Sequence, residues 1–142
     1  MKNYNNNSKK KIIHWPGKTI FESDNNLFSL ITMNHHPVHL DINYAKRQKH
    51  KKILVNGLLV ISIVVGMSVK DISLDAVANL GYDKIIHHNP VFLNDTLYAE
   101  SLLIKKEKTK KKNYSICTYD TFAHNQNNKL ILSLQRKILI KV

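Results

Sequence analysis

Residues 53–69 of this 142-residue chain read ILVNGLLVISIVVGMSV and form its one long apolar stretch. A helix that spans a bilayer needs about 20 consecutive apolar residues, whereas this stretch is shorter and is interrupted early by Asn56 and Gly57. A helix that is apolar on every side is a buried helix in a globular domain. We therefore expect a central core helix, and neither a membrane span nor a membrane partner.

The start of this helix carries chemical information. Asn56 is a good N-cap, because its side chain can accept a hydrogen bond from the amide of Leu58 or Leu59. The amide of Gly57 then has no intrahelical partner and lies at the positive end of the helix dipole. Gly57 also has no side chain to keep a substrate carbonyl away, so this helix start is suited to stabilise a developing oxyanion. The alternative is that Gly57 only permits a tight turn into the helix.

Downstream of this helix the sequence indicates strands. Period-2 alternation of apolar residues predicts strands over 82–88, 96–105, 114–124 and 130–141, with a turn at 124–128. An amphipathic sheet must cover its apolar face, and the helix at 53–69 is the available cover. The expected fold class is therefore α+β, an antiparallel sheet wrapped around one long central helix.

Upstream of the helix, residues 1–13 are polar and rich in Asn and Lys, and we expect them to be a disordered basic tail. Residues 14–142 then form a single domain. Its first part is predicted to contain a turn at 15–17, an extended piece at 18–21, a helix from Ser23 or Asp24 to about Thr32, and a short helix that Asp41 caps. The apolar stripe of the first of these helices would be Leu27, Leu30 and Ile31.

The segment 34–41, NHHPVHLD, is dense in groups that can do chemistry. His39 is the strongest candidate base, because imidazole titrates near neutrality and can take a proton from water. Pro37 stiffens the turn that presents it. A base and the Gly57 oxyanion donor in one pocket describe addition to, or elimination from, an activated carbonyl compound. A purely structural role for His39 is the alternative.

Other histidines are candidates for a metal site or a surface role. His35, His36, His39 and Asp41 could be metal ligands, but their spacing matches no zinc signature and no cysteine or distant His pair completes a ligand set. We therefore expect no metal. His87 and His88 are adjacent on a predicted strand and so face opposite sides. We interpret them as a surface feature.

The chain is basic, with 22 Lys and Arg against 10 Asp and Glu and a net charge of +12. Such a charge could serve nucleic acid, an anionic membrane surface or a phosphorylated substrate. The run KKEKTKKK at 105–112 is typical of solvated charge, and the few aromatics are not interleaved with the basic runs, so we expect no nucleic-acid partner. Cys117 alone cannot form an intrachain disulfide. No apolar signal segment follows the N-terminus, so a cytoplasmic location is expected.

Two segments resemble the MaoC-like hydratases of the hotdog superfamily, whose pattern is D-x-N-P-x-H-x-D-x-x-Y/F-A followed, after a short loop, by V/H-G-x-L at a helix start. The residues that match this pattern are Pro37, His39, Asp41, Tyr44, Ala45, Gly57 and Leu59. Further words are similar to the mesaconyl-CoA hydratase-like branch, namely ANLG at 78–81, PVF at 90–92, DTL at 95–97, Asn125-Gln126 and Arg136. The resemblance covers about residues 17–142.

The resemblance implies a hotdog domain that forms a homodimer, or a higher oligomer, with the active site at the subunit interface. It implies a hydro-lyase that adds water reversibly to a 2-enoyl-CoA such as mesaconyl-CoA. CoA would be part of the substrate, with no separate cofactor. His39 aligns with the catalytic His of the family and Gly57 with its oxyanion Gly. The expected catalytic set is His39, Asn34, Gly57 and Asp41, and the expected substrate-binding residues are Asn56, His36, Pro37 and Leu58.

The chain departs from the family pattern at Asn34, where many members have a catalytic Asp. An amide can orient a water but cannot accept its proton, so His39 would be the sole base, oriented by Asp41. The Phe-Gly usual before the helix is replaced by His50-Lys51. One alternative is a hotdog acyl-CoA thioesterase, although no acidic residue lies at the start of the long helix. The other is a catalytically silent acyl-thioester-binding module, which Asn34 favours.

Overall fold

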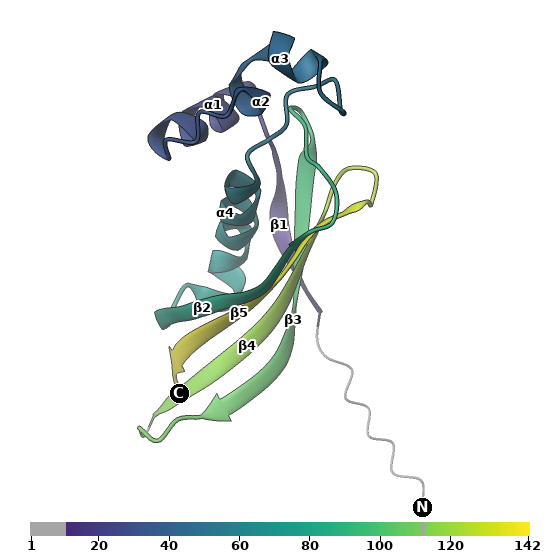
Figure 1. Cartoon of the computed structure of the whole chain (residues 1–142). Helices are drawn as coiled ribbons and strands as arrows, with labels where there is room; N and C mark the ends of the chain where they lie inside the picture. The colour runs from purple at the N-terminus through teal and green to yellow at the C-terminus, as the bar shows by residue number, and fades with distance from the viewer. Residues whose placement is uncertain (1–10, 112) are drawn as a thin grey trace, which may run out of the picture.

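The computed structural model describes residues 11–111 and 113–142. Within them the chain forms five strands, four α-helices and one π-helical turn, shown in Figure 1. In chain order these are β1 (Lys11–Thr19), α1 (Glu22–Ile31), α2 (Pro37–Leu40), α3 (Ile42–Lys46), α4 (Gly57–Ser68), the π-helical turn (Val69–Ser73), β2 (Ala76–His87), β3 (Thr96–Lys108), β4 (Tyr114–His124) and β5 (Leu130–Lys141).

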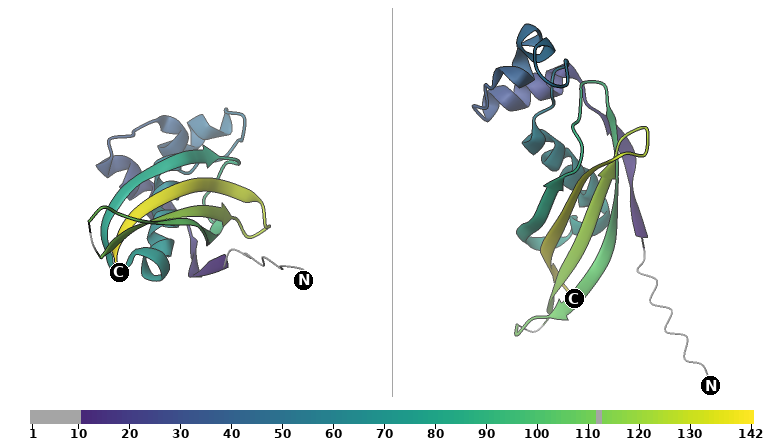
Figure 2. Two further views of the ribbon diagram at one scale, coloured as in Figure 1. Left: turned by 90° about the horizontal axis from the view of Figure 1, so that it is seen from below. Right: turned by 45° about the vertical axis from the view of Figure 1, so that its right-hand side comes forward.

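The five strands form one antiparallel sheet in the order β1-β3-β4-β5-β2. The sheet curves around α4, and α1, α2 and α3 gather at the end of the molecule where α4 begins (Figures 1 and 2). Strands β1 and β2 are the two edges of the sheet. The expected α+β architecture, an antiparallel sheet around one central helix, is confirmed.

The core lies between α4 and the concave face of the sheet. Leu59, Val60 and Val64 of α4 are buried against apolar residues of β3, β4 and β5, which include Leu97, Ala99, Ala123, Ile131, Leu132 and Leu134. Burial of apolar area at about 25 cal/mol per Å² makes this contact the main stabilising term of the domain. The helix is not buried on every side, however, because Leu58 in its first turn is 60% exposed in the single chain.

The structure corrects two predictions near the N-terminus. Residues 11–13, which we assigned to a disordered tail, lie in β1, which begins at Lys11; residues 1–10, the rest of the predicted tail, lie outside the described part. Residues 15–17, predicted to be a turn, lie within β1. The register with β3 shifts there between His14 and Lys18, so an irregularity in the strand takes the place of a turn.

Strand β2 begins at Ala76, six positions before the start we predicted from alternation. Its first residues read AVANLG and do not alternate between apolar and polar side chains, so the sequence pattern did not indicate this part of the strand. Within residues 11–111 and 113–142, no helix is long and apolar enough to cross a bilayer.

Helix α1 turns the opposite face inward from the one expected. The predicted apolar stripe of Leu27, Leu30 and Ile31 is 62%, 55% and 70% exposed, whereas Asn25 and Ser29 are completely buried. The two buried polar side chains make hydrogen bonds to the segments that build the candidate site. Those hydrogen bonds replace the water that a buried amide or hydroxyl would lose.

Candidate active site

His39 lies on α2, a single helical turn that His36 and Pro37 begin. The His36 side chain accepts a hydrogen bond from the amide of Val38 at 3.1 Å, and proline suits the first helical position because its missing N–H would have no intrahelical partner. A backbone hydrogen bond joins α2 to the segment before α4: the Leu54 amide donates to the Val38 carbonyl at 3.1 Å. This places the His39 ring beside the start of α4.

The tautomer of His39 follows from its one hydrogen bond. Its Nδ1 lies 2.7 Å from the backbone carbonyl oxygen of Leu54. A carbonyl oxygen can only accept, so Nδ1 carries the proton and donates. The neutral ring then presents Nε2 as a lone pair, which is the form that a general base requires. The carbonyl of Leu54, not the side chain of Asp41, orients the ring.

Gly57 begins α4 as predicted. The Asn56 side chain accepts from the Leu58 amide at 3.0 Å, which confirms Asn56 as the N-cap. The Gly57 amide is the first of the helix and has no intrahelical acceptor. His39 and Gly57 line one cavity of about 260 Å³ between α4, the end of β2 and the segment that follows it. The lining residues are His39, His50, Leu54, Val55, Gly57, Val60, His87, His88, Asn89, Pro90 and Val91.

Buried polar side chains of α1 link His39 to Asn56, the residue before Gly57; we call this link the clamp. Asn25 of α1 donates through Nδ2 to the His39 carbonyl oxygen at 3.0 Å, and its Oδ1 accepts from the Asn56 amide at 2.9 Å. Asn56 Nδ2 in turn lies 3.4 Å from the Ser29 Oγ. Asn25 and Ser29 were not predicted as site residues, because we expected the apolar stripe of α1, and not its polar side, to face inward.

The other predicted site residues do not line the cavity. The Asp41 carboxylate caps α3, accepting from the amides of Asn43 and Tyr44 at 2.8 and 3.0 Å. Asn56 is 1% exposed with its side chain used within the protein, and Leu58 points outward. Asn34 and His36 precede α2 and Pro37 is its first residue, and none of the three lines the cavity; the Asn34 Oδ1 lies 3.5 Å from the His36 amide.

His87 belongs to the cavity, which the sequence analysis missed. The two adjacent histidines do face opposite sides: His88 Nε2 lies 2.8 Å from the Ser133 Oγ, whereas His87 lines the cavity together with Gly57. His87 is exposed in the single chain, as expected of a surface residue, and it also lines the cavity, which we did not predict. Burial, and then the charge of His88, lower the pKa of His87 below its ordinary value, so its imidazole is neutral near pH 7.

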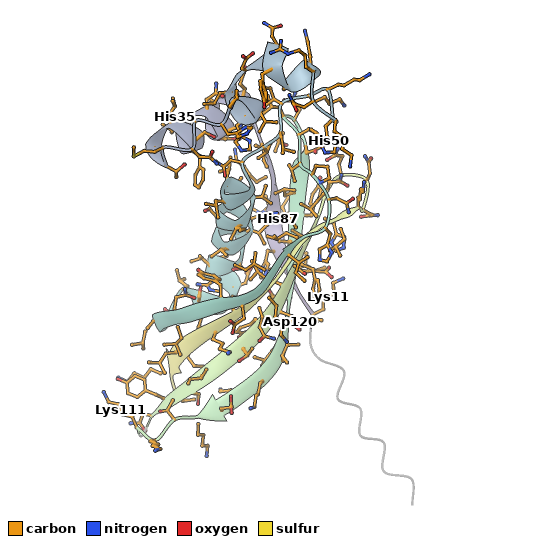
Figure 3. The ribbon with its side chains drawn as sticks, viewed as in Figure 1. Lys11, His35, His50, His87, Lys111 and Asp120 are labelled. Carbon is orange, nitrogen blue, oxygen red and sulfur yellow. The ribbon has the colours of Figure 1, made fainter. Side chains whose placement is uncertain are left out.

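Basic residues lie at one side of this cavity. Lys46 ends α3, and the loop that follows carries Arg47, Lys49, Lys51 and Lys52; all five are exposed, and His50 of this loop lines the cavity. The β3–β4 hairpin carries the other Lys-rich run, and Figure 3 shows Lys111 of that hairpin at the opposite end of the molecule from His50. Among the described residues, no group of three or more His, Cys, Asp or Glu side chains could hold a metal ion.

The sequence of residues 4–124 matches the family described as MaoC like domain. The chain belongs to the MaoC-like domain family. Two curated relatives are a hydratase and a dehydratase. The chain is 29% identical over 130 residues to the mesaconyl-CoA hydratase of Cereibacter sphaeroides, and 28% identical over 130 residues to the beta-methylmalyl-CoA dehydratase of Chloroflexus aurantiacus. These alignments cover 92% of the chain but only 38% and 37% of the two relatives.

Solved structures show the same fold. A monoamine oxidase regulatory protein from Archaeoglobus fulgidus superposes with a TM-score of 0.85 at 28% identity, over 94% of this MaoC-like chain and 89% of the other. A Mycobacterium tuberculosis protein with a double hotdog fold superposes with a TM-score of 0.86 at 18% identity, over 94% of this chain and 42% of the other. The hotdog fold expected from the sequence is confirmed.

Proposed function

We propose that this MaoC-like domain catalyses the reversible addition of water to a 2-enoyl-CoA. The observation that carries the proposal is the His39–Leu54 hydrogen bond, which makes Nε2 the lone-pair nitrogen of the neutral His39 ring, in a residue that lines the same cavity as the Gly57 helix start. A base and an oxyanion donor on one cavity are the two groups that this reaction needs. The hydratase and dehydratase names of the relatives support the same class of reaction.

In the proposed reaction, the thioester oxygen accepts a hydrogen bond from the Gly57 amide. His39 Nε2 takes a proton from water as the hydroxide adds to C3 of the enoyl group. The electron pair of the double bond moves toward the thioester, and the negative charge is stabilised at the helix start. The enolate then collapses, and C2 takes from His39 the proton that came from water, so that the elements of one water are added.

The substrate we favour is a short enoyl-CoA, branched and dicarboxylic as in mesaconyl-CoA. The cavity of about 260 Å³ has room for a short acyl group, and the two curated relatives are named for substrates of this kind. CoA is part of this substrate and no further cofactor is needed. The exposed cations of residues 46–52 are placed to meet the phosphates of CoA beside the cavity.

We also propose that the chain forms a homodimer. A cytoplasmic location remains a prediction. Edge strand β2 exposes Val77, Leu80 and Ile86 in the single chain, and Leu58 of α4 is exposed as well. An apolar edge strand of this kind is a template for pairing with another copy. A homodimer formed through β2 would cover these residues.

A catalytically silent acyl-thioester-binding module is the second candidate. It is favoured by Asn34, which cannot accept a proton and does not line the cavity. A thioesterase is less well supported, because none of the residues that line the cavity is an Asp or Glu that could activate water against the carbonyl carbon.

The test is a hydration assay of the purified chain over a panel of enoyl-CoAs that includes mesaconyl-CoA and crotonyl-CoA. We expect His39→Ala to leave a folded protein whose kcat is lower by at least ~10². His35→Ala is the matched control, because His35 is an exposed neighbour that does not line the cavity. Binding of the acyl-CoA without hydration by the wild type would select the binding module. Near-normal kcat in His39→Ala would remove His39 as the base.

A further inference from the structure

His87 lies directly against Gly57 at the start of α4. A Cβ built on Gly57 would be 3.2 Å from Nε2 of His87 and 3.3 Å from its Cε1. The imidazole therefore covers the one position of the helix start that has no side chain. Both residues line the cavity into which His39 also faces, and Figure 3 labels His87 beside α4.

The inward direction of His87 is set by the end of β2. The pairing of β2 with β5 has an irregularity between Asp83 and Ile86, which adds one residue to β2 and shifts the alternation that follows. After it, His87 pairs with Leu132. Paired residues in an antiparallel sheet share a face, and Leu132 is completely buried against α4. His87 therefore faces the helix.

The ring nitrogens of His87 are free to bind a ligand. Among the described residues, no side-chain hydrogen bond uses either of them, whereas the neighbouring His88 is bonded to Ser133. A neutral imidazole has one N–H donor and one lone pair. A thioester oxygen bound at the Gly57 amide would lie within reach of a donor on this ring. Oxyanion sites act through several fixed donors aimed at the position where charge develops.

We propose that His87 is a second oxyanion donor, whose ring N–H binds the thioester oxygen beside the Gly57 amide. This inference rests on the proposed hydratase reaction and adds a residue to it. As hydroxide adds to C3 and the double-bond electrons move to the thioester oxygen, the two N–H groups share the charge. His87 keeps its proton throughout, because the proton released by water goes to His39 and then to C2.

Two variants of His87 test the role. His87→Phe keeps a planar ring of similar size and has no donor, whereas His87→Gln keeps an N–H donor. We expect His87→Phe to lower kcat for crotonyl-CoA by ~10²–10³ with little change in KM, because the interaction strengthens in the transition state. His87→Gln should recover at least a tenth of the wild-type kcat. His124→Phe on β4 is the control for replacing a histidine by phenylalanine on a strand.

A second readout does not depend on turnover. Butyryl-CoA with a ¹³C-labelled carbonyl cannot be hydrated, and the infrared stretch of its carbonyl moves to lower frequency with each hydrogen bond that the oxygen accepts. We expect a low-frequency band with the wild type and with His87→Gln, and a smaller shift with His87→Phe. A shift in His87→Phe equal to that of the wild type, or a kcat within threefold of it, would overturn the role of His87.

The outcomes separate the two proposals. A wild type that shifts the butyryl-CoA carbonyl through His87 but hydrates no enoyl-CoA would overturn the hydratase and keep His87 as a carbonyl ligand. A wild type that hydrates enoyl-CoA, with a carbonyl shift independent of His87, would keep the hydratase and overturn the role of His87. No binding of butyryl-CoA and no hydration would overturn both.

Discussion

At the scale of single residues, the site depends on what Gly57 lacks. Its amide is the free donor at the helix start, and the absence of a Cβ allows the His87 ring to lie against it. Sequence reasoning found Gly57 and His39, because a capped helix start and a histidine after a proline are local patterns. It missed His87, because the adjacent His87 and His88 show only that one of them faces the helix, and the irregularity in β2 that decides which one does so depends on pairing with β5.

Replacing Gly57 tests this close approach. A Cβ at 3.2 Å from Nε2 of His87 forces the ring to move by a few tenths of an ångström, so Gly57→Ala should remain folded and lose about tenfold or more in kcat. Gly57→Val should abolish turnover. Gly66→Ala is the control, because a Cβ there meets nothing within 4 Å and Gly→Ala in a helix stabilises by roughly 0.5–1 kcal/mol. Thermal unfolding and the hydration assay give both readouts. Full activity of Gly57→Ala would show that the ring is not held there.

At the scale of elements, α1 acts as a clamp on the catalytic segments. Its apolar stripe was expected to face inward but is exposed. The sequence could not show that the polar side would be buried, because Asn25 and Ser29 find partners on α2 and on the segment before α4 only in the folded chain. The bounds of β4 and β5 were predicted to the residue, because the polar turn at 125–129 separates the two strands clearly in the sequence.

Removing the clamp should loosen His39. Asn25→Ala leaves the His39 carbonyl and the Asn56 amide without partners, which costs roughly 1–3 kcal/mol per buried group. We expect a lower free energy of unfolding and a lower kcat in Asn25→Ala. Asn25→Asp can still accept from Asn56 but cannot donate to His39, so it separates the two contacts. Asn26→Ala, the neighbour on α1, is the control in urea unfolding and in the assay. Equal effects at positions 25 and 26 would remove the clamp.

At the scale of the whole molecule, the two sheet edges differ. Strand β1 carries Lys11 and Lys18, which pair with acidic residues of the same chain, and lysine on an edge discourages pairing with another copy. Strand β2 carries exposed Val77 and Leu80 and only one lysine, Lys84, while β1 also exposes Ile13 and Trp15 beside its lysines. The sequence predicted a dimer only through the family resemblance, because the edge order of the sheet depends on contacts between strands far apart in the chain.

A lysine substituted on each edge strand in turn tests which edge forms the dimer. Leu80→Lys on β2 should convert a dimer into a monomer in sedimentation equilibrium at micromolar concentration, because lysine ammonium groups from two copies would be brought together in an apolar interface. Ile13→Lys on β1 is the matched control, since Ile13 is an exposed apolar residue on the opposite edge. A wild type that sediments as a monomer and still hydrates enoyl-CoA would contradict the shared interface.

The strand order also has a consequence for the growing chain on the ribosome. Lys11 of β1 pairs with Leu102 of β3, and Ala76 of β2 pairs with Ile140 of β5. Both edge strands are therefore synthesised long before their partners, and α4 before the strands that cover it. At ~5–20 residues per second, this wait is on the order of several seconds. Only the meander of β3, β4 and β5 joins neighbours in sequence, so the nascent helix stays uncovered until these three strands have been synthesised.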